Sequence, residues 1–125
     1  MLTEKDYCDY NTCVALKELG YNGTVGECSH FGAFYMGGKE IFYDRLYNSE
    51  LKESECLRVP LYLAQKWLRE ERHLHIEVRW LDNLWYEYEV QDAEGKVVAE
   101  GCASPNYEEA HRTAVYMSTD QLKER

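Results

Sequence analysis

Two short segments of the sequence bring together side chains that could do chemistry. Cys28, Ser29 and His30 place a nucleophilic thiol near a base, and on an extended chain Cys28 and His30 would point to the same side. A thiol hydrolase also needs a group that orients the base and an oxyanion hole. The sequence indicates neither, so we predict no catalytic residue.

The second segment contains His73, His75 and Glu77, which are of types that bind metal ions. His75 and Glu77 lie two residues apart on a predicted strand, so their side chains share one face. No third or fourth ligand follows at a standard metal-binding spacing, and we expect His111 on the other side of the sheet. We interpret the histidines as solvated surface residues and predict no metal and no cofactor.

The cysteines do not form a recognisable framework. Five are present at irregular spacing, and none belongs to a Cys-x-x-Cys pair: Cys8, Cys13, Cys28, Cys56 and Cys102. An odd number without regular spacing is not typical of a secreted disulfide scaffold. We expect reduced thiols at partly buried positions.

Composition and charge indicate one acidic domain. The chain has 125 residues, of which 45% are hydrophobic and 14% aromatic, and its formal net charge is −9. This length suits a single hydrophobic core. The negative charge disfavours nucleic acids and anionic membranes as partners.

The N-terminal residues are polar and acidic, which is not typical of a signal peptide. The sequence also lacks the run of roughly 20 apolar residues that spans a bilayer. We therefore expect a cytoplasmic protein that does not enter a membrane.

The N-terminal part predicts a helix and a hairpin. Asp9 can cap a helix over residues 10–19, which Gly20 can end. Aromatic-rich segments 31–36 and 39–43 flank Gly37-Gly38, which favours a two-residue hairpin turn. This register places Phe34 opposite Ile41.

The remaining sequence predicts a helix, three strands and a last helix. The polar residues 47–58 suggest a linker-like loop, and Pro60 suits the start of a helix over residues 61–72. Strands are expected at 75–80, 85–90 and 96–102, the last two joined by a turn at 92–95 that Gly95 closes. The final helix is expected to begin near residue 107, with Asn106 as its cap.

Alternation along the first two of these strands separates an apolar face from a polar one. Ile76, Val78 and Trp80 share the face that we expect to contact the helices, together with Tyr86, Tyr88 and Val90. The opposite face then carries the candidate binding residues His75, Glu77, Arg79, Trp85, Glu87 and Glu89. An exposed Trp among charged residues can anchor a protein partner. Alternatively, the N-terminal hairpin covers this face and packs on Trp85.

The order of elements from Pro60 to Leu122 resembles the double-stranded RNA-binding domain. The resemblance includes the spacing of small and polar residues at the last helix, namely Ser104, Tyr107, Glu108, Glu109, Ala110 and Ala114. That family places lysines at the start of this helix to contact phosphates, whereas this chain has Glu108 and Glu109. The resemblance therefore implies the architecture and argues against RNA binding.

A second resemblance covers most of the chain. Several segments look like a family of small uncharacterised proteins. They are Pro-Leu-Tyr-Leu-Ala-Gln-Lys-Trp-Leu-Arg-Glu at 60–70, a Trp- and Tyr-rich hairpin, the ending Leu-Gly-Tyr of the first helix at 19–21 and Tyr-Glu-Glu-Ala at 107–110. These occur in Bacteroides-type gut bacteria, their phages and mobile elements. The resemblance implies a phage or mobile-element origin and no particular mechanism.

Together these patterns predict one α+β domain over residues 1–125. A helix and a hairpin (1–46) and a linker-like loop (47–58) precede an α-β-β-β-α unit (59–125), in which helices pack on one face of an antiparallel three-stranded meander. The hairpin either extends this sheet or lies on its other face. We expect a non-catalytic binding or accessory protein with a protein partner or a second copy of itself. The alternatives are a nucleic-acid-binding module, which the charge disfavours, and an acidic DNA mimic that inhibits DNA-binding enzymes.

Overall fold

The computed structural model describes residues 6–22, 32–36, 39–43, 55–81 and 85–123. Within these ranges the chain forms an α+β fold, as predicted. Its elements in chain order are α1 (Tyr10–Glu18), β1 (Gly32–Met36), β2 (Lys39–Tyr43), β3 (Glu55–Leu57), α2 (Leu61–Glu71), β4 (His75–Leu81), β5 (Trp85–Gln91), β6 (Val97–Ser104) and α3 (Tyr107–Lys123).

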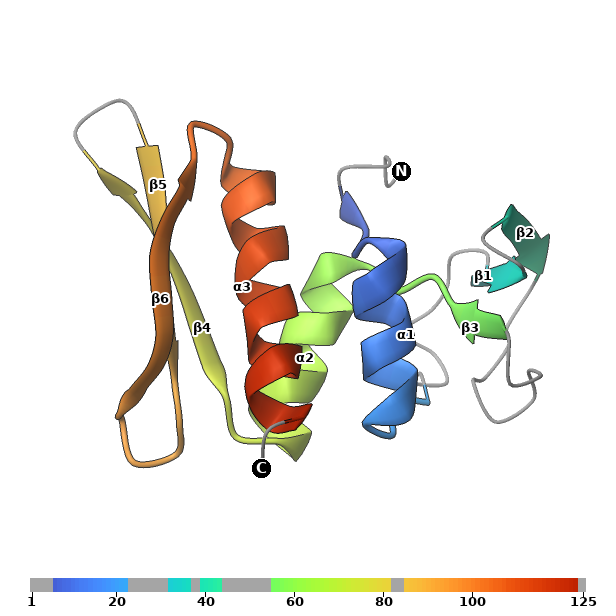
Figure 1. Cartoon of the computed structure of the whole chain (residues 1–125), viewed down its shortest axis with the longest axis horizontal. Helices are drawn as coiled ribbons and strands as arrows, with labels where there is room; N and C mark the ends of the chain where they lie inside the picture. The colour runs from blue at the N-terminus through green and yellow to red at the C-terminus, as the bar shows by residue number, and fades with distance from the viewer. Residues whose placement is uncertain (1–5, 23–31, 37–38, 44–54, 82–84, 124–125) are drawn as a thin grey trace.

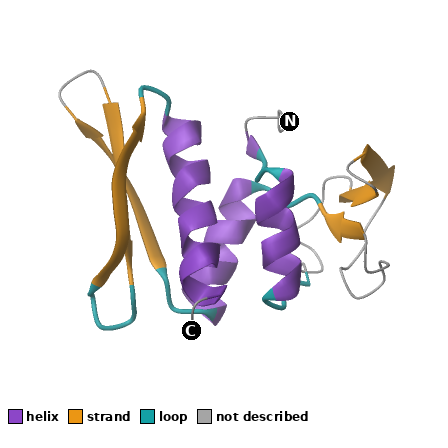
Figure 2. Cartoon of the chain, viewed as in Figure 1, coloured by secondary structure: helices purple, strands orange, loops and turns teal. Residues whose placement is uncertain are grey.

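The described residues form two antiparallel sheets on opposite sides of the helices (Figure 1). One sheet has the order β4-β5-β6 and packs against α2 and α3. The other has the order β2-β1-β3 and lies beyond α1, as the two groups of orange strands in Figure 2 show. Both predictions for the hairpin are therefore wrong, since it neither extends the meander nor covers its other face.

The N-terminal elements follow the predicted local signals. The Asp9 side chain accepts a hydrogen bond of 2.8 Å from the Thr12 N–H and caps α1. Gly20 has a φ of +106°, a conformation that favours glycine after a helix. In the hairpin, Phe34 is the Cα partner of Ile41, which confirms the predicted register.

The prediction of a linker-like loop at 47–58 is wrong for the C-terminal part of this range. Residues 55–57 form β3, which pairs antiparallel with β1 so that Cys56 is the Cα partner of Tyr35. The Cys56 side chain is buried, and it belongs to the same apolar cluster as Leu16 of α1. The packing of β3 against α1 explains a strand in a stretch whose polar composition suggested a loop. The rest of that stretch, 47–54, lies outside the described residues.

The two helices of the α-β-β-β-α unit bury the predicted apolar residues. Pro60 is the N-cap of α2, and Leu61, Ala64 and Leu68 are buried below it. Trp67 is half-buried and makes an edge contact with Tyr21, with ring centroids 5.7 Å apart.

The last helix begins as predicted. The Asn106 side chain accepts a hydrogen bond of 3.1 Å from the Glu109 N–H. Ala110 and Ala114 are fully buried where α3 packs on the sheet. Small side chains at this four-residue spacing allow the helix to approach the strands closely.

The meander has the predicted alternation with one exception. Tyr88 and Val90 are buried against the helices, and Ile76 and Val78 pack beside them. Trp80 is instead 61% exposed, although it continues the same alternation. The helix α3 begins at Tyr107, whose ring covers Tyr86 on the central strand (centroids 5.5 Å apart) and leaves Trp80 on the edge strand uncovered.

The turn between β5 and β6 agrees with the sequence. The Gly95 N–H donates to the Asp92 carbonyl at 3.0 Å, and Gly95 has a φ of +82°. The carboxylate of Asp92 also accepts hydrogen bonds from the Glu94 and Lys96 N–H groups at 2.9 and 3.0 Å. These contacts fix where β6 begins and therefore its register against β5.

Candidate functional site

The six candidate binding residues lie together on the side of the β4-β5-β6 sheet that faces away from the helices. We call this surface the outer sheet face, and it consists of His75, Glu77, Arg79, Trp85, Glu87 and Glu89. Within β4 and β5 these positions have the same parity, which places their side chains on one side. The β2-β1-β3 sheet lies beyond the helices, so no element in the described part of the chain covers the outer sheet face (Figure 1).

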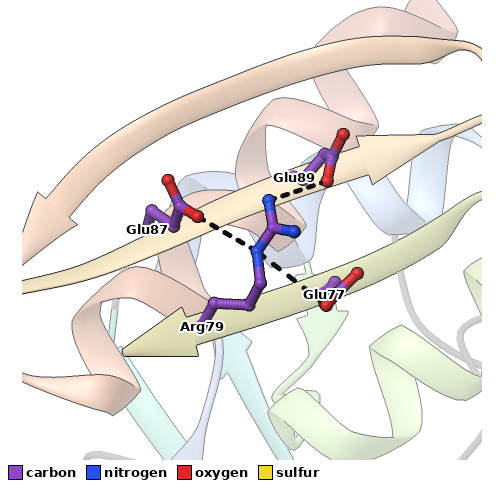
Figure 3. A network of polar contacts seen from close by, with 4 residues as sticks. All are labelled: Glu77, Arg79, Glu87 and Glu89. Atoms are coloured by element: carbon purple, nitrogen blue, oxygen red, sulfur yellow. Dashed lines mark hydrogen bonds and ion pairs between the residues drawn. The ribbon is translucent and has the colours of Figure 1, made fainter. Parts of the chain in front are cut away.

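Arg79 is the centre of a network of three carboxylates on the outer sheet face (Figure 3). Its Nε atom lies 3.0 Å from Glu87 Oε1 and 3.8 Å from Glu77 Oε1, and its second terminal nitrogen lies 3.0 Å from Glu89 Oε2. The Arg79 side chain is about half exposed, whereas the Glu89 side chain is only 14% exposed. Water therefore screens the Glu77 contact most and the Glu89 contact least.

The carboxylates of this face outnumber its guanidinium group. Glu77 and Glu89 are Cα partners across β4 and β5, and Glu89 and Glu100 are Cα partners across β5 and β6. Like charges directly opposite each other destabilise a sheet. Arg79 neutralises part of the first pair, and Glu100 has no ion pair with another described residue. The outer sheet face is therefore net negative.

Glu100 is a residue of this surface that the sequence pattern did not reveal. The strand β6 contains two residues that have no partner on β5. One is Val98, between the partners of Val90 and Gln91, and the other is Ala103, between the partners of Tyr86 and Glu87. These bulges break the alternation by which a face is normally assigned. Only the observed register places Glu100 beside Glu89.

Trp85 lies at the end of the outer sheet face, opposite Leu81 on β4. It is 48% exposed, which agrees with the prediction of an accessible Trp. Trp80 is exposed on the opposite side of the same end of the hairpin. Both faces of this end thus present aromatic surface.

The residues of metal-binding type do not assemble into a site. No group of three or more His, Cys, Asp or Glu side chains in the described ranges is placed to hold a metal ion. His73 and His75 are exposed, and Glu77 faces Arg79. The Cys28-Ser29-His30 segment lies outside the residues that the structure describes.

Three cysteines that are distant in the sequence lie in one buried cluster. The thiols of Cys8, Cys13 and Cys56 are free and buried, and Cys13 Sγ accepts a hydrogen bond from the Val59 N–H at 3.4 Å. Burial raises the pKa of Cys56 to about 12. Burial also raises the pKa of Cys8, and a hydrogen bond with Cys13 raises it further. These groups remain protonated at neutral pH and are poor nucleophiles.

A small cavity between the start of α1 and α3 has a volume of about 330 Å³. Three charged residues line it, Asp9, Glu109 and Arg112. Thr113 and Tyr116 complete the lining. Arg112 already contacts Glu109 at 3.6 Å and donates to the Tyr7 carbonyl at 3.3 Å. No local pattern in the sequence predicts this cavity, because Asp9 lies about a hundred positions from the other lining residues.

From α2 to α3 the elements follow the predicted order of helix, three strands and helix. The first turn of α3 carries two carboxylates, Glu108 and Glu109, which would repel phosphates. Among the described residues, no helix is long and apolar enough to span a bilayer. Comparisons with protein-family models, curated proteins and solved structures find no match to this chain.

Proposed function

We propose that this protein is a non-catalytic binding protein that contacts another protein through the outer sheet face. The observation that carries the proposal is an uncovered sheet face that presents Trp85 beside the Arg79 carboxylate network. Exposed aromatic residues beside ordered charges are typical of protein-binding surfaces. The resemblance to phage and mobile-element proteins supports an accessory role in the cytoplasm of a bacterial host.

The electrostatics favour a protein over a nucleic acid as the partner. This surface carries four carboxylates, those of Glu77, Glu87, Glu89 and Glu100, and one guanidinium group. Glu108 and Glu109 add negative charge at the start of α3. Phosphates would be repelled from both places. A cationic protein surface would instead be attracted to the outer sheet face.

Site-specific photo-crosslinking tests the proposal. A photoreactive amino acid replaces Trp85 in one variant and Tyr62 in a control variant, since Tyr62 is 44% exposed but lies on α2. Both variants are expressed in the organism that encodes the chain and irradiated. We expect a discrete crosslinked protein from position 85 and none from position 62. Crosslinks from neither position, or equally from both, would contradict the proposed surface.

A gel-shift assay with duplex RNA and duplex DNA at low salt separates this proposal from nucleic-acid binding. We expect no shift, because the net charge of −9 opposes association with phosphates. A shift that weakens as salt is added would favour the nucleic-acid-binding alternative.

A further inference from the structure

The two edges of the β4-β5-β6 sheet differ in how regular they are. The strand β6 carries two bulges along its pairing with β5, and bulges protect an edge against further pairing. The strand β4 pairs with β5 over seven consecutive residues without an irregularity. It contains neither Pro nor Lys, which are residues that often protect an exposed edge. The β4 edge is therefore the better template for another strand.

The backbone groups that β4 directs outward can be assigned from one hydrogen bond. The Gln65 side chain on α2 donates to the Ile76 carbonyl at 3.2 Å, as expected for a carbonyl that points away from β5. Alternate residues of an antiparallel strand direct their backbone groups to the same side. Val78 and Trp80 therefore also present outward N–H and C=O groups, and neither residue has a further partner in the described part of the chain.

We propose that β4 is the edge at which a second copy of this chain pairs, antiparallel and centred on Val78. The outward backbone N–H and C=O groups of the two Val78 residues would then pair with each other on the two-fold axis. The next outward pairs would join Trp80 of each copy to Ile76 of the other. A carbonyl oxygen has two lone pairs, so the Gln65 hydrogen bond to Ile76 can persist. The product is a continuous six-stranded sheet.

Charge complementarity selects this register. With Val78 opposite Val78, Glu77 of each copy lies opposite Arg79 of the other at a position where side chains are close. A register centred on Arg79 would instead place two guanidinium groups against each other. Within one copy the contact between Arg79 and Glu77 is the longest of the three, at 3.8 Å. The second copy would supply a further carboxylate to each Arg79.

The same register covers the exposed aromatic surface that the helices leave open. Trp80 is 61% exposed, and its pairing position places it over Ile76 of the second copy. Two such contacts form per dimer because of the two-fold symmetry. Pairing at β4 does not involve Trp85. Crosslinking at position 85 and dimer formation therefore test the two proposals separately.

Light scattering during size-exclusion chromatography over a wide range of protein concentrations tests the proposal. The wild type is expected to reach twice the monomer mass of 14.8 kDa. Glu77→Arg places two cations opposite each other in the dimer and should weaken dimerisation about tenfold or more. Its fold should be retained, since the new cation faces Glu89 on β5. Glu94→Arg makes the same charge change in the turn after β5 and should dimerise as the wild type does.

A mixing experiment and hydrogen exchange make the test specific to the register. Glu77→Arg mixed with Arg79→Glu restores both opposite-charge contacts and should yield a heterodimer. If Arg79→Glu does not fold, amide exchange of the wild type decides: Val78 N–H should become protected as the concentration rises, while Glu77 and Arg79 stay protected throughout. A monomeric wild type at every concentration would overturn the proposal. So would a dimer that Glu77→Arg leaves intact or in which Val78 exchanges freely.

Discussion

The ring of Tyr88 lies against Gly101, its Cα partner on the neighbouring strand. A Cβ atom built on Gly101 would lie 3.0 Å from the Tyr88 hydroxyl oxygen and 3.1 Å and 3.2 Å from two ring carbons. Tyr88 is buried on the helix-facing side of the central strand. The absence of a side chain at Gly101 is therefore what allows this ring to approach the next strand so closely.

Gly101→Ala is expected to destabilise the fold by about 1–3 kcal/mol, because the added methyl group overpacks a buried ring. The opposing gain from reduced chain entropy is smaller, about 0.4–1 kcal/mol. Urea denaturation followed by circular dichroism measures the difference. In a Tyr88→Leu background the same substitution should cost less, which a double-mutant cycle detects. An Ala that stabilises the wild-type background would show that the ring can move aside.

Removing the charge of Arg79 and removing that of Glu77 should change the free energy of unfolding in opposite directions. Arg79→Gln leaves three carboxylates close together and should lower the free energy of unfolding by about 1 kcal/mol, with a smaller effect at high salt.

Glu77→Gln removes one member of the like-charge pair with Glu89 and should raise the free energy of unfolding by about 0.3 kcal/mol. Urea denaturation of dilute protein checks both variants, since dilution separates the fold from self-association. A Glu77→Gln that destabilises as much as Arg79→Gln would contradict the like-charge argument.

Local signals in the sequence were sufficient for most elements. A capping Asp at position 9, Gly20 after the helix and the Asp92–Gly95 turn each act over a few residues, and the structure contains all of them. Period-two alternation likewise predicted which side of β4 and β5 faces the helices, and six outer-face residues were grouped correctly. Such features depend on neighbours along the chain.

Features that depend on distant segments were not predictable in this way. The strand β3 exists because β1 lies beside it, and Trp80 is exposed because α3 reaches only the central strand at that level. The bulges of β6 displace Glu100 into the acidic row without any local signal. The cluster of Cys8, Cys13 and Cys56 likewise forms only when α1 meets β3.

His111 should make stability depend on pH in one direction. It is buried on α3, its Nε2 atom has no hydrogen-bond partner among the described residues, and burial lowers its pKa from 6.5, although Glu108 opposes this shift. The unfolded chain therefore takes up the proton first as the pH falls. Stability should decrease as the pH falls below the unfolded value of 6.5 and stop decreasing below the folded value.

Urea denaturation between about pH 8 and about pH 5.5 measures this dependence, a range in which most carboxylates stay ionised. His111→Gln should flatten the curve, whereas the exposed control His75→Gln should leave it unchanged. A curve that stays equally steep in His111→Gln would assign the dependence to another group.

The buried thiols should be protected from modification as long as the chain is folded. Thiol–disulfide exchange requires a thiolate. Burial raises the pKa of Cys56 to about 12 and that of Cys8 above its usual range. In a Cys28→Ser/Cys102→Ser variant the remaining thiols are Cys8, Cys13 and Cys56. A chromogenic disulfide reagent at about pH 8 should react with none of them quickly in native buffer and with all three in urea. Rapid release of one equivalent from the native protein would show that a cysteine of this cluster is accessible, contrary to its position in the core.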